Sequence, residues 1–422
     1  MEEYKRLNVG FVGLGKLGKI SAETLAEAHD VHGYDINPEA GKYMENDVQR
    51  CVSLEECIKG SENCPTGRDV ILIAVQTPHH PDYDGREPTS HLEPKDFDYE
   101  HIINVVKEVE ELADDNSVIV VISTMLPGTI RRQINPLIHR HRFLYNPYLI
   151  AQGTVAHDMR EPEMIMIGTA NGDDQDCQIL YDLYDPLVID GTRFEIGTWE
   201  EMEATKVFYN TFISAKLGIV NMIQDVAMKI GHMNVDVVTD ALKNSDKRIM
   251  GPSYMKAGFG DGGGCHPRDN IALRVLNDRY HMGYDLFDAI MKAREEQAAN
   301  MARYCLEFKM PVVILGKSFK PGLKDDPSGS SSMLVGWYIE KLGSQKVYYD
   351  EAPDEGAYTY LIHDKALMPE RFNPGSCIID PYRELKHSDP LTKHCVIKYY
   401  GNSRPSIPGI QSRFPLPTPE GF

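Results

Sequence analysis

The sequence predicts an α/β protein in which a helical segment separates two α/β domains. Short apolar runs alternate with helical spacing over residues 1–198, as in a parallel sheet covered by helices. Long helical patterns without strand signals fill residues 199–308. Apolar runs and helical spacing alternate again over residues 309–403, which predicts a second, smaller α/β domain. Proline and glycine are frequent in residues 404–422, which we expect to form an extended tail.

The composition is that of an ordinary globular protein. Of the 422 residues, 42% are hydrophobic and 25% are charged, so the chain is long enough for two or three packed domains. The formal net charge of -19 argues against a nucleic-acid or membrane-surface binder, whose binding face would be basic. No apolar run is long enough to span a membrane, and the first residues do not resemble a signal peptide. We therefore expect a cytoplasmic protein.

Cysteine usage fits a reducing compartment. The eight cysteines are scattered through a large chain, which indicates free thiols and not a disulfide framework. Cys51, Cys57 and Cys64 lie close in sequence, but they lack the CxxC spacing. We expect them to be structural thiols.

A dinucleotide fingerprint stands near the N-terminus. A short apolar strand over residues 8–13 leads into a GxGxxG turn, a helical pattern to about residue 28, and a second strand that ends at Asp35. This order predicts a Rossmann domain, with the cofactor pyrophosphate at the start of the helix. Asp35 would bond the ribose hydroxyls and repel a 2′-phosphate, which favours NAD over NADP. The turn residues expected to bind NAD are Gly13, Gly15, Lys16, Leu17 and Gly18.

Two further strands, over residues 69–75 and 117–123, end in polar turns. Ligands of an open parallel sheet bind at the carboxyl ends of its strands, so Thr77 and Thr124 are placed to meet the cofactor. Turn capping is an alternative role for either hydroxyl. Residues 142–145 and 164–168 would complete the sheet. The loop 79–94 holds three histidines, but their irregular spacing indicates a solvated insertion, and no metal site is predicted.

A glycine-rich run over residues 260–264 precedes Cys265. Glycines in a row permit a tight turn or the close approach of a ligand. The apolar spacing that follows is helical, so Cys265 would lie near a helix N-terminus, where the thiolate is favoured. The alternative is an inert buried cysteine behind a flexible loop.

The central segment predicts helices over residues 200–230 and 235–242, from 270 onward, and over 286–308. Lys206 and Asn210 are four residues apart and share one helix face, where an ammonium and an amide could stabilise an oxyanion. A solvated surface lysine is the alternative. These helices could also form a homodimer interface. Strands are expected over residues 312–316 and 346–350, and near Ile378 and Val396.

Along nearly its whole length the chain resembles the UDP-glucose/GDP-mannose dehydrogenase family. The order of several motifs carries the resemblance better than any one of them. Besides the GxGxxG turn with Asp35, they are Thr77-Pro78, Ser123-Thr124, Pro127-Gly128-Thr129, Gly153-Thr154, His157-Asp158, Lys206 with Asn210, Cys265 with Pro267 and Asp269, and Gly316 with Phe319-Lys320-Pro321.

The resemblance implies NAD-dependent oxidation of the C6 alcohol of a nucleotide sugar to the carboxylate. In such enzymes the cysteine, here Cys265, adds to the aldehyde as a thiohemiacetal, which is oxidised to a thioester and hydrolysed. Lys206, Asn210 and Thr124 would be further catalytic residues. Asp269 would hold water or relay protons, although an ordinary acid in the first helical turn is the alternative. Gln152 would contact NAD.

The resemblance also implies the substrate-binding residues. Lys320 matches a lysine that reaches the substrate, and Arg383 would be a phosphate contact. Tyr254 and Phe259 could instead be plain core aromatics. The full set comprises Tyr148, Tyr254, Phe259, Gly262, Lys320 and Arg383.

Departures from the family pattern leave alternatives open. Two glutamates of the family are replaced by Tyr148 and Gln152, neither of which can act as a carboxylate base. Arg268 stands where the family has lysine, and residues 324–330 lack the family's arginine. The alternatives are a two-electron oxidation of an unusual sugar nucleotide and a non-catalytic nucleotide-sugar or NAD binding protein.

Overall fold

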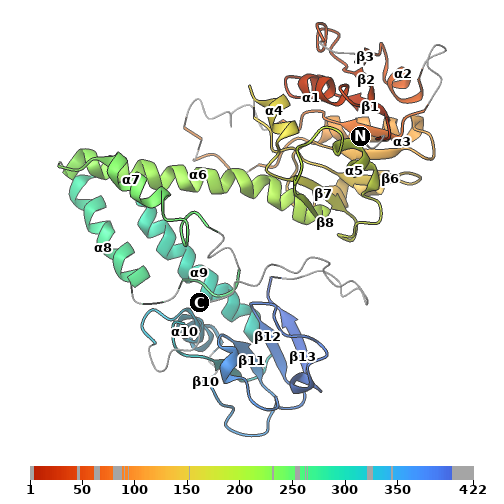
Figure 1. Ribbon diagram of the computed structural model, residues 1–422. Helices are drawn as coiled ribbons and strands as arrows, with labels where there is room; N and C mark the ends of the chain where they lie inside the picture. Colours follow the sequence, from red (N-terminus) through yellow and green to blue (C-terminus); the bar gives the residue numbers. More distant parts are fainter. Residues whose placement is uncertain are drawn as a thin grey trace. The chain divides into compact units, whose positions relative to one another are not determined.

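The computed structural model describes residues 4–44, 48–60, 67–78, 88–89, 91–93, 95–151, 153–230, 232–251, 257–261, 263, 265–320, 327–343 and 346–401. In the helix that begins at Cys265, the side chains at positions 265, 268, 269, 272, 275 and 276 lie outside this description. The chain forms two compact units, Met1–Lys216 and Leu217–Phe422, each built around its own sheet (Figure 1).

The first unit contains an eight-stranded sheet in the order β3-β2-β1-β4-β5-β6-β7-β8. All neighbouring strands are parallel except β6 and β7, which meet antiparallel at Tyr145 and Gly168. The order reverses direction at β1, the switch point at which such sheets bind ligands. The strands are β1 Asn8–Val12, β2 Asp30–Tyr34, β3 Gln49–Arg50, β4 Val70–Ile73, β5 Val118–Val121, β6 Arg142–Tyr145, β7 Ile165–Thr169 and β8 Phe194–Thr198.

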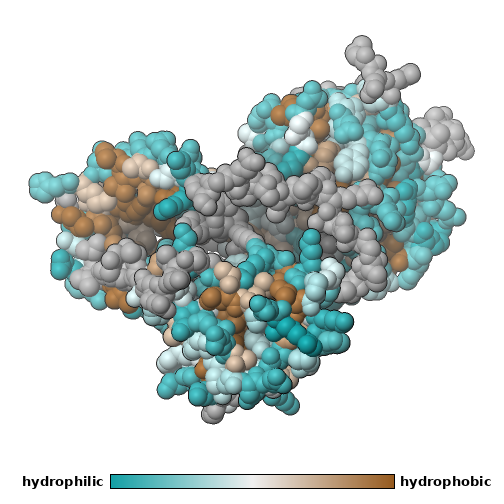
Figure 2. Space-filling model, turned by 60° about the horizontal axis from the view of Figure 1, so that its bottom comes forward, coloured by the Kyte–Doolittle hydropathy of each residue, from teal (hydrophilic) through white to brown (hydrophobic). Residues whose placement is uncertain are grey.

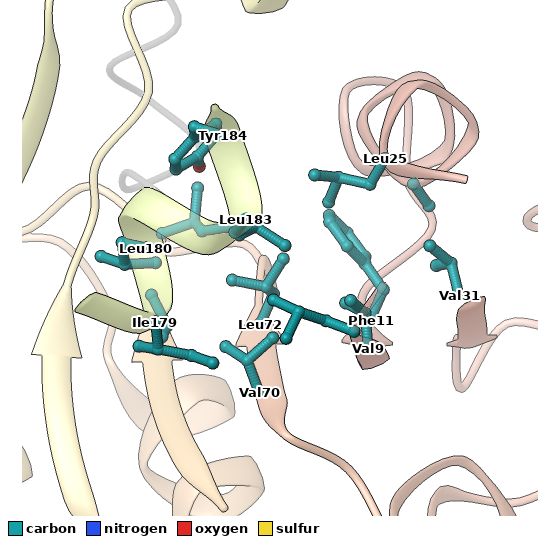
Figure 3. Close-up of a cluster of buried hydrophobic side chains, with 14 of the residues drawn as sticks. Val9, Phe11, Leu25, Val31, Val70, Leu72, Ile179, Leu180, Leu183 and Tyr184 are labelled. Atoms are coloured by element: carbon teal, nitrogen blue, oxygen red, sulfur yellow. The ribbon is translucent and has the colours of Figure 1, made fainter. Parts of the chain in front are cut away.

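Helices cover both faces of this sheet. On one face α1 (Gly18–Leu25), α4 (Val155–Arg160) and α5 (Gln178–Tyr184) contribute to one buried cluster. Figure 3 shows Leu25 of α1 and Leu183 of α5 directed toward the side chains of β1 and β4. On the other face, α2 (Leu54–Lys59) and α3 (Glu100–Leu112) bury the second cluster. Both faces are therefore apolar, as a mostly parallel sheet requires.

The predicted α/β fold is confirmed, including the strand at Arg142–Tyr145. Two strands of this sheet were not predicted. One is β3, which consists of two residues, both exposed, and the other is β8, which directly precedes a long helix. A π-helical turn, η2 (Ile130–Ile134), and a 3₁₀ turn, η3 (Asn135–Leu137), follow β5.

Four helices make up most of the described part of the central segment. The helices are α6 Trp199–Ile230, α7 Val235–Lys243, α8 Cys265–Tyr280 and α9 Leu286–Leu306. Cys265 is the first residue of α8, which confirms its expected position at a helix N-terminus. Among the described residues, no helix is long and apolar enough to cross a membrane.

The second unit contains a five-stranded parallel sheet in the order β10-β9-β11-β12-β13. Its strands are β9 Val312–Leu315, β10 Val347–Tyr349, β11 Thr359–Ile362, β12 Cys377–Asp380 and β13 Val396–Tyr399. Helix α10 (Ser331–Gly343) follows β9, and short 3₁₀ turns occur at η4 (Lys365–Leu367) and η5 (Pro390–Thr392). The central strand β11 was missed by the sequence analysis. The boundaries at residues 198, 308 and 403 stay predictions.

Candidate active site

The GxGxxG turn forms a cradle that fits a dinucleotide. Gly13 has a φ of +106°, and a Cβ there would lie 2.8 Å from the Ala74 backbone. A Cβ on Gly18 would lie 1.9 Å from the Gly13 carbonyl oxygen. Both positions therefore require glycine for the turn itself. At Gly15 a Cβ would meet nothing within 4 Å, so this glycine leaves open space at the cleft, as close approach of a pyrophosphate needs.

The start of α1 and Asp35 complete the expected NAD contacts. No side chain caps the N-terminus of α1, so no side-chain oxygen competes with an anion for the positive end of its dipole. The Asp35 carboxylate accepts hydrogen bonds from Leu14 N (2.7 Å) and Asn37 N (2.8 Å). These bonds orient it while each oxygen keeps a lone pair for a ribose hydroxyl. Lys16 and Leu17 are exposed and line the same cleft.

Two side-chain hydroxyl groups, those of Thr77 and Ser123, form hydrogen bonds between the segments that follow β4 and β5. Thr77 Oγ1 donates to the Thr124 carbonyl oxygen (2.7 Å), and Ser123 Oγ donates to that of Val75 (2.5 Å). Together with the GxGxxG turn these strand ends line a hollow of about 540 Å³. Thr77 and Thr124 thus lie where the sequence analysis expects the cofactor, and Lys206 lines the same hollow.

Lys206 projects from α6 to the carboxyl edge of the sheet. Its Nζ donates a hydrogen bond of 2.5 Å to the carbonyl oxygen of Tyr148, and burial lowers the pKa of its ammonium. A partly desolvated ammonium interacts more strongly with a developing anion than an exposed one. Asn210, one turn further along α6, is exposed and is not among the residues that line the hollow.

A buried carboxylate, Glu203, was missed by the sequence analysis. It lies on α6 and accepts hydrogen bonds from Gly128 N (2.6 Å) and Ile130 N (2.8 Å) in the turn that follows Thr124. Burial raises the pKa of this carboxyl to about 7, while the two backbone donors favour its charged form. Glu203 therefore fastens the Pro127-Gly128-Thr129 turn to the helix that carries Lys206.

The Tyr148 phenol is hydrogen-bonded to a buried tyrosine. Its hydroxyl forms a partly buried hydrogen bond with that of Tyr184 (3.0 Å), and Tyr184 OH donates to Asn146 Oδ1. Burial raises the pKa of the Tyr148 phenol well above its usual value. Its ring still lines the hollow. A role in substrate binding stays a prediction, but the phenol does not replace a base.

In the second unit, side chains pack against or hydrogen-bond to almost every described residue of the loop 257–263, which leads to Cys265. A Cβ on Gly258 would lie 2.3 Å from the Tyr382 ring, and the Phe259 ring packs edge-on against His363, with centroids 4.6 Å apart. Gly263 has a φ of +96°, and a Cβ there would lie 3.2 Å from the Phe319 ring. The Gly-rich loop and the Phe319-Lys320 motif therefore meet.

An ion pair in this loop was not anticipated. Arg294 of α9 donates through Nε to Asp261 Oδ1 (2.5 Å) and through Nη2 to the Gly329 carbonyl oxygen (3.0 Å). His266 Nδ1 lies 3.8 Å from the same carboxylate. The pair is largely shielded, because the Arg294 side chain is 10% exposed and that of Asp261 is 28% exposed. Its members are too far apart in sequence for spacing to reveal them.

The remaining predicted residues divide into three groups. Arg383 donates to the backbone carbonyls of Pro381, Tyr400 and Ala257, so its guanidinium anchors the loop, and a phosphate contact stays a prediction. Lys320 is exposed at the end of its motif. Asp269 lies on α8, but its side chain is outside the described part of the chain, as are the whole residues Gln152, Tyr254 and Gly262.

Replacing Asp35 with serine is expected to raise the KM for NAD by about tenfold or more. Hydrogen bonds to charged groups contribute about 1.5–3 kcal/mol, which corresponds to such a change. The relative use of NADP should increase, because the repulsion of the 2′-phosphate is lost. Steady-state kinetics with both cofactors measures this. Asp30→Asn is the matched control, because Asp30 begins the same strand and forms an exposed ion pair with Arg6 (2.9 Å). If both changes raised the KM for NAD equally, this would contradict the binding of the NAD ribose by Asp35.

The Asp261–Arg294 pair should show a coupling energy in a double-mutant cycle of Asp261→Asn and Arg294→Met. We expect about 0.5–3 kcal/mol in the free energy of unfolding, because a single change leaves a shielded partner without its counter-charge. The control is the exposed pair of Arg303 and Glu296 on the same helix (2.7 Å), for which we expect less than about 1 kcal/mol. Urea unfolding of the four variants of each cycle measures both. Equal coupling in the two cycles would contradict the stronger coupling expected of the shielded Asp261–Arg294 pair.

The doubly wound sheet with its glycine cradle, the acid at Asp35 and the cleft-lining lysine define the class of NAD-dependent oxidoreductases. The family models agree: the NAD-binding domain of the UDP-glucose/GDP-mannose dehydrogenase family matches residues 7–188, and its central domain matches residues 200–296. The chain therefore belongs to the UDP-glucose/GDP-mannose dehydrogenase family.

Individual relatives are distant but extend over most of the chain. A UDP-glucose 6-dehydrogenase of Bacillus subtilis, YwqF, is 26% identical over 86% of this chain and 82% of its own length. A GDP-mannose 6-dehydrogenase of Pseudomonas putida is 27% identical over 82% and 81%, respectively. Among solved structures, a ternary complex of GDP-mannose dehydrogenase from Pseudomonas aeruginosa is similar to 93% of this chain and 99% of its own, with a TM-score of 0.73 and 20% identity. This structural similarity supports the fold.

Proposed function

We propose that the chain oxidises the C6 alcohol of a nucleotide sugar to the carboxylate, with NAD as the oxidant. The observation that carries the proposal is Lys206, which lines the same hollow as the GxGxxG turn and Thr124. A pure NAD-binding protein has no need of a desolvated ammonium at that position. Both UDP-glucose and GDP-mannose dehydrogenases are among the relatives, so the nucleotide and the sugar are left open.

Each residue of the site is proposed to take one part in the reaction. Gly15, the start of α1 and Asp35 would hold NAD, which supplies the hydride acceptor. The Lys206 ammonium would stabilise negative charge on the C6 oxygen. Cys265 begins α8, where the helix dipole favours its thiolate, which would add to the aldehyde. Asn210 would assist Lys206, and Asp269 would hold or deprotonate water for hydrolysis of the thioester.

A two-electron oxidation that stops at the aldehyde is the second candidate. The observation that favours it is Tyr148, whose hydroxyl is hydrogen-bonded to Tyr184 and whose pKa is raised by burial. This side chain cannot take over the proton transfer for which the family uses a glutamate. Hydrolysis of a thioester would then depend on Asp269 alone.

Counting NADH per sugar consumed distinguishes these functions. The enzyme is incubated with UDP-, GDP- and TDP-sugars, and NADH is compared with sugar consumed and carboxylate formed. Two NADH and one carboxylate per sugar support the four-electron oxidation. One NADH with an aldehyde product supports the two-electron reaction. If no nucleotide sugar yields NADH while NAD still binds, the non-catalytic alternative replaces both.

We also propose that the chain forms a homodimer through the central helices. Figure 2 shows hydrophobic surface gathered at the left, where α7 lies in Figure 1. Exposed apolar patches of this kind commonly mark protein interfaces. Size-exclusion chromatography with light scattering tests the proposal, and a monomeric mass would contradict it. The exposed apolar residues of α6 and α7 include Phe208, Phe212, Ile213, Leu217, Met228 and Val237.

A cytoplasmic location is proposed as well. Six cysteines in the described part of the chain are free thiols: Cys51, Cys57, Cys177, Cys305, Cys377 and Cys395. Free thiols in such number persist in a reducing compartment.

A further inference from the structure

Two cysteines that the proposed reaction does not use meet beside the NAD-binding strand β2. Cys51 directly follows β3, and its backbone N–H donates to the Gly33 carbonyl oxygen of β2 (2.8 Å). Cys57 lies on α2, and its thiol donates to the His32 carbonyl oxygen of the same strand (3.1 Å). Both side chains belong to the buried cluster beneath α2 and α3.

The start of α2 explains why the two thiols come together. Ser53 is the N-cap and accepts a hydrogen bond from Glu56 N (3.1 Å), so Cys57 falls at the fourth position of the helix. A residue just before a helix commonly packs against this fourth position. Cys51, two residues before the cap, joins Cys57 in the same buried cluster, and the interaction between the two sulfurs is the main cause of their pKa shifts.

This contact makes the two sulfurs chemically different. The hydrogen bond from Cys57, together with one from His32, lowers the pKa of Cys51 to about 6 from an ordinary 9.0. The same hydrogen bond and burial raise the pKa of Cys57. Cys51 is also the more accessible thiol, at 7% exposure against 0% for Cys57. A less buried thiol of lower pKa beside a second thiol is the arrangement of an attacking and a resolving cysteine. Cys177 differs, because burial raises its pKa to about 12.

We propose that Cys51 and Cys57 form an oxidation site that a hydroperoxide converts to an intramolecular disulfide. The Cys51 thiolate attacks one oxygen of hydrogen peroxide, the O–O bond breaks, and the leaving hydroxide takes a proton to become water. The Cys57 sulfur then attacks the sulfur of the Cys51 sulfenic acid, so that an S–S bond forms and the S–O bond breaks. The hydroxyl group leaves with the Cys57 proton as a second water. Two thiols are oxidised by two electrons, and one peroxide is reduced to two waters. Thiols exchange the disulfide back.

Oxidation at this site is expected to weaken NAD binding. Cys51 is bonded to Gly33, which lies two residues before Asp35, and Cys57 is bonded to His32 one residue earlier. A new covalent bond would shift β3 and α2 against β2 and so displace the carboxylate that orients the ribose. We expect the Kd for NAD to rise by at least about fivefold, the lower end of ordinary coupling between sites.

Peptide mass measurement tests the disulfide directly. Trypsin cleaves after Arg50 and Lys59, so the peptide 51–59 contains both cysteines, whereas Cys64 falls in the next peptide. The full chain is treated with hydrogen peroxide, alkylated under denaturing conditions and digested. We expect peptide 51–59 to lose two hydrogens and to take up no alkyl group, while the Cys177 peptide is alkylated. The proposal is overturned if peptide 51–59 remains doubly alkylated, carries a sulfinic acid, or is linked to the Cys64 peptide.

NAD binding tests the consequence without any need for turnover. Calorimetric titration of NAD uses a Cys265→Ser background, so that oxidation at position 265 cannot contribute. Peroxide should raise the Kd, dithiothreitol should restore it, and Cys51→Ser should abolish the change. A Cys395→Ser control should behave like the background. An unchanged Kd for NAD despite a formed disulfide would refute the coupling to NAD. If the proposed nucleotide-sugar oxidation is wrong, the peptide mass and the Kd for NAD can still be measured, so the two failures are distinguishable.

Discussion

Replacing Cys265 with serine is expected to abolish carboxylate formation and to leave NAD binding unchanged. The loss should be on the order of 10³-fold or more, as for other covalent nucleophiles. The physical reason is the acidity of the side chain: a thiol at a helix N-terminus ionises near neutral pH, whereas a serine hydroxyl does not. Quantification of the carboxylate by mass spectrometry, alongside NAD titration, measures the effect.

The structure offers a matched control for this change. Cys395 is a partly exposed thiol that hydrogen-bonds the Asn373 carbonyl oxygen (3.4 Å) at the edge of the second sheet. Cys395→Ser should retain full activity. If Cys265→Ser still formed carboxylate at a rate close to that of the wild type, a covalent mechanism through Cys265 would be excluded.

The second large effect is expected at Lys206. Lys206→Met should lower kcat by about 10²–10³-fold, the usual cost of losing one donor that stabilises an oxyanion. The KM for NAD should change little, because the expected cofactor contacts lie in the GxGxxG turn and at Asp35. The carbonyl oxygen of Tyr148 would lose its donor, so a stability measurement must accompany the kinetics. Lys216→Met, on an exposed position of the same helix, is the control.

The pH dependence of stability gives an independent measurement on Lys206. Burial lowers the pKa of its ammonium below the ordinary 10.5. Between the lowered pKa of the folded chain and the ordinary pKa of the unfolded chain, the unfolded chain binds more protons than the folded one. The free energy of unfolding should therefore rise with pH over this range. Lys206→Met should lack this rise, whereas Lys216→Met should keep it. Melting temperatures from neutral pH to about pH 10.5 test this, and parallel curves for the two variants would contradict the burial of Lys206.

The sequence predicts the first domain well because its signals are local. The apolar run at Asn8–Val12, the glycines at 13, 15 and 18 and the acid at position 35 all lie within thirty residues or so. In the structure Gly15 and Gly18 line the cleft, and Asp35 bonds the backbone of the glycine turn at Leu14. The carboxyl-end rule likewise places Thr77 and Thr124 correctly at the strand ends. Strands were missed where the signal is short or is masked by a neighbouring element, as for Gln49–Arg50 and for Phe194–Thr198 before the long helix.

What spacing could not predict is the set of long-range anchors. Arg383 reaches the Ala257 carbonyl oxygen across 126 residues of sequence, and Glu203 holds the turn at Gly128 across 75. Each is a charged residue on an otherwise ordinary element, and nothing in the nearby sequence distinguishes it from a solvated side chain. The contact between Cys51 and Cys57 was also missed, because its cause is the local turn into α2 and not a recognisable cysteine spacing.

The hydrogen bond between Lys206 and Tyr148 has an evolutionary consequence. The lysine is docked on the main chain of residue 148, not on its side chain. Substitution at position 148 can therefore exchange a carboxylate for a phenol, or for another group, without removing the acceptor that positions the ammonium. In the proposed reaction, a substitution at position 148 would therefore change the hydrolytic step without moving the ammonium that assists the hydride transfer.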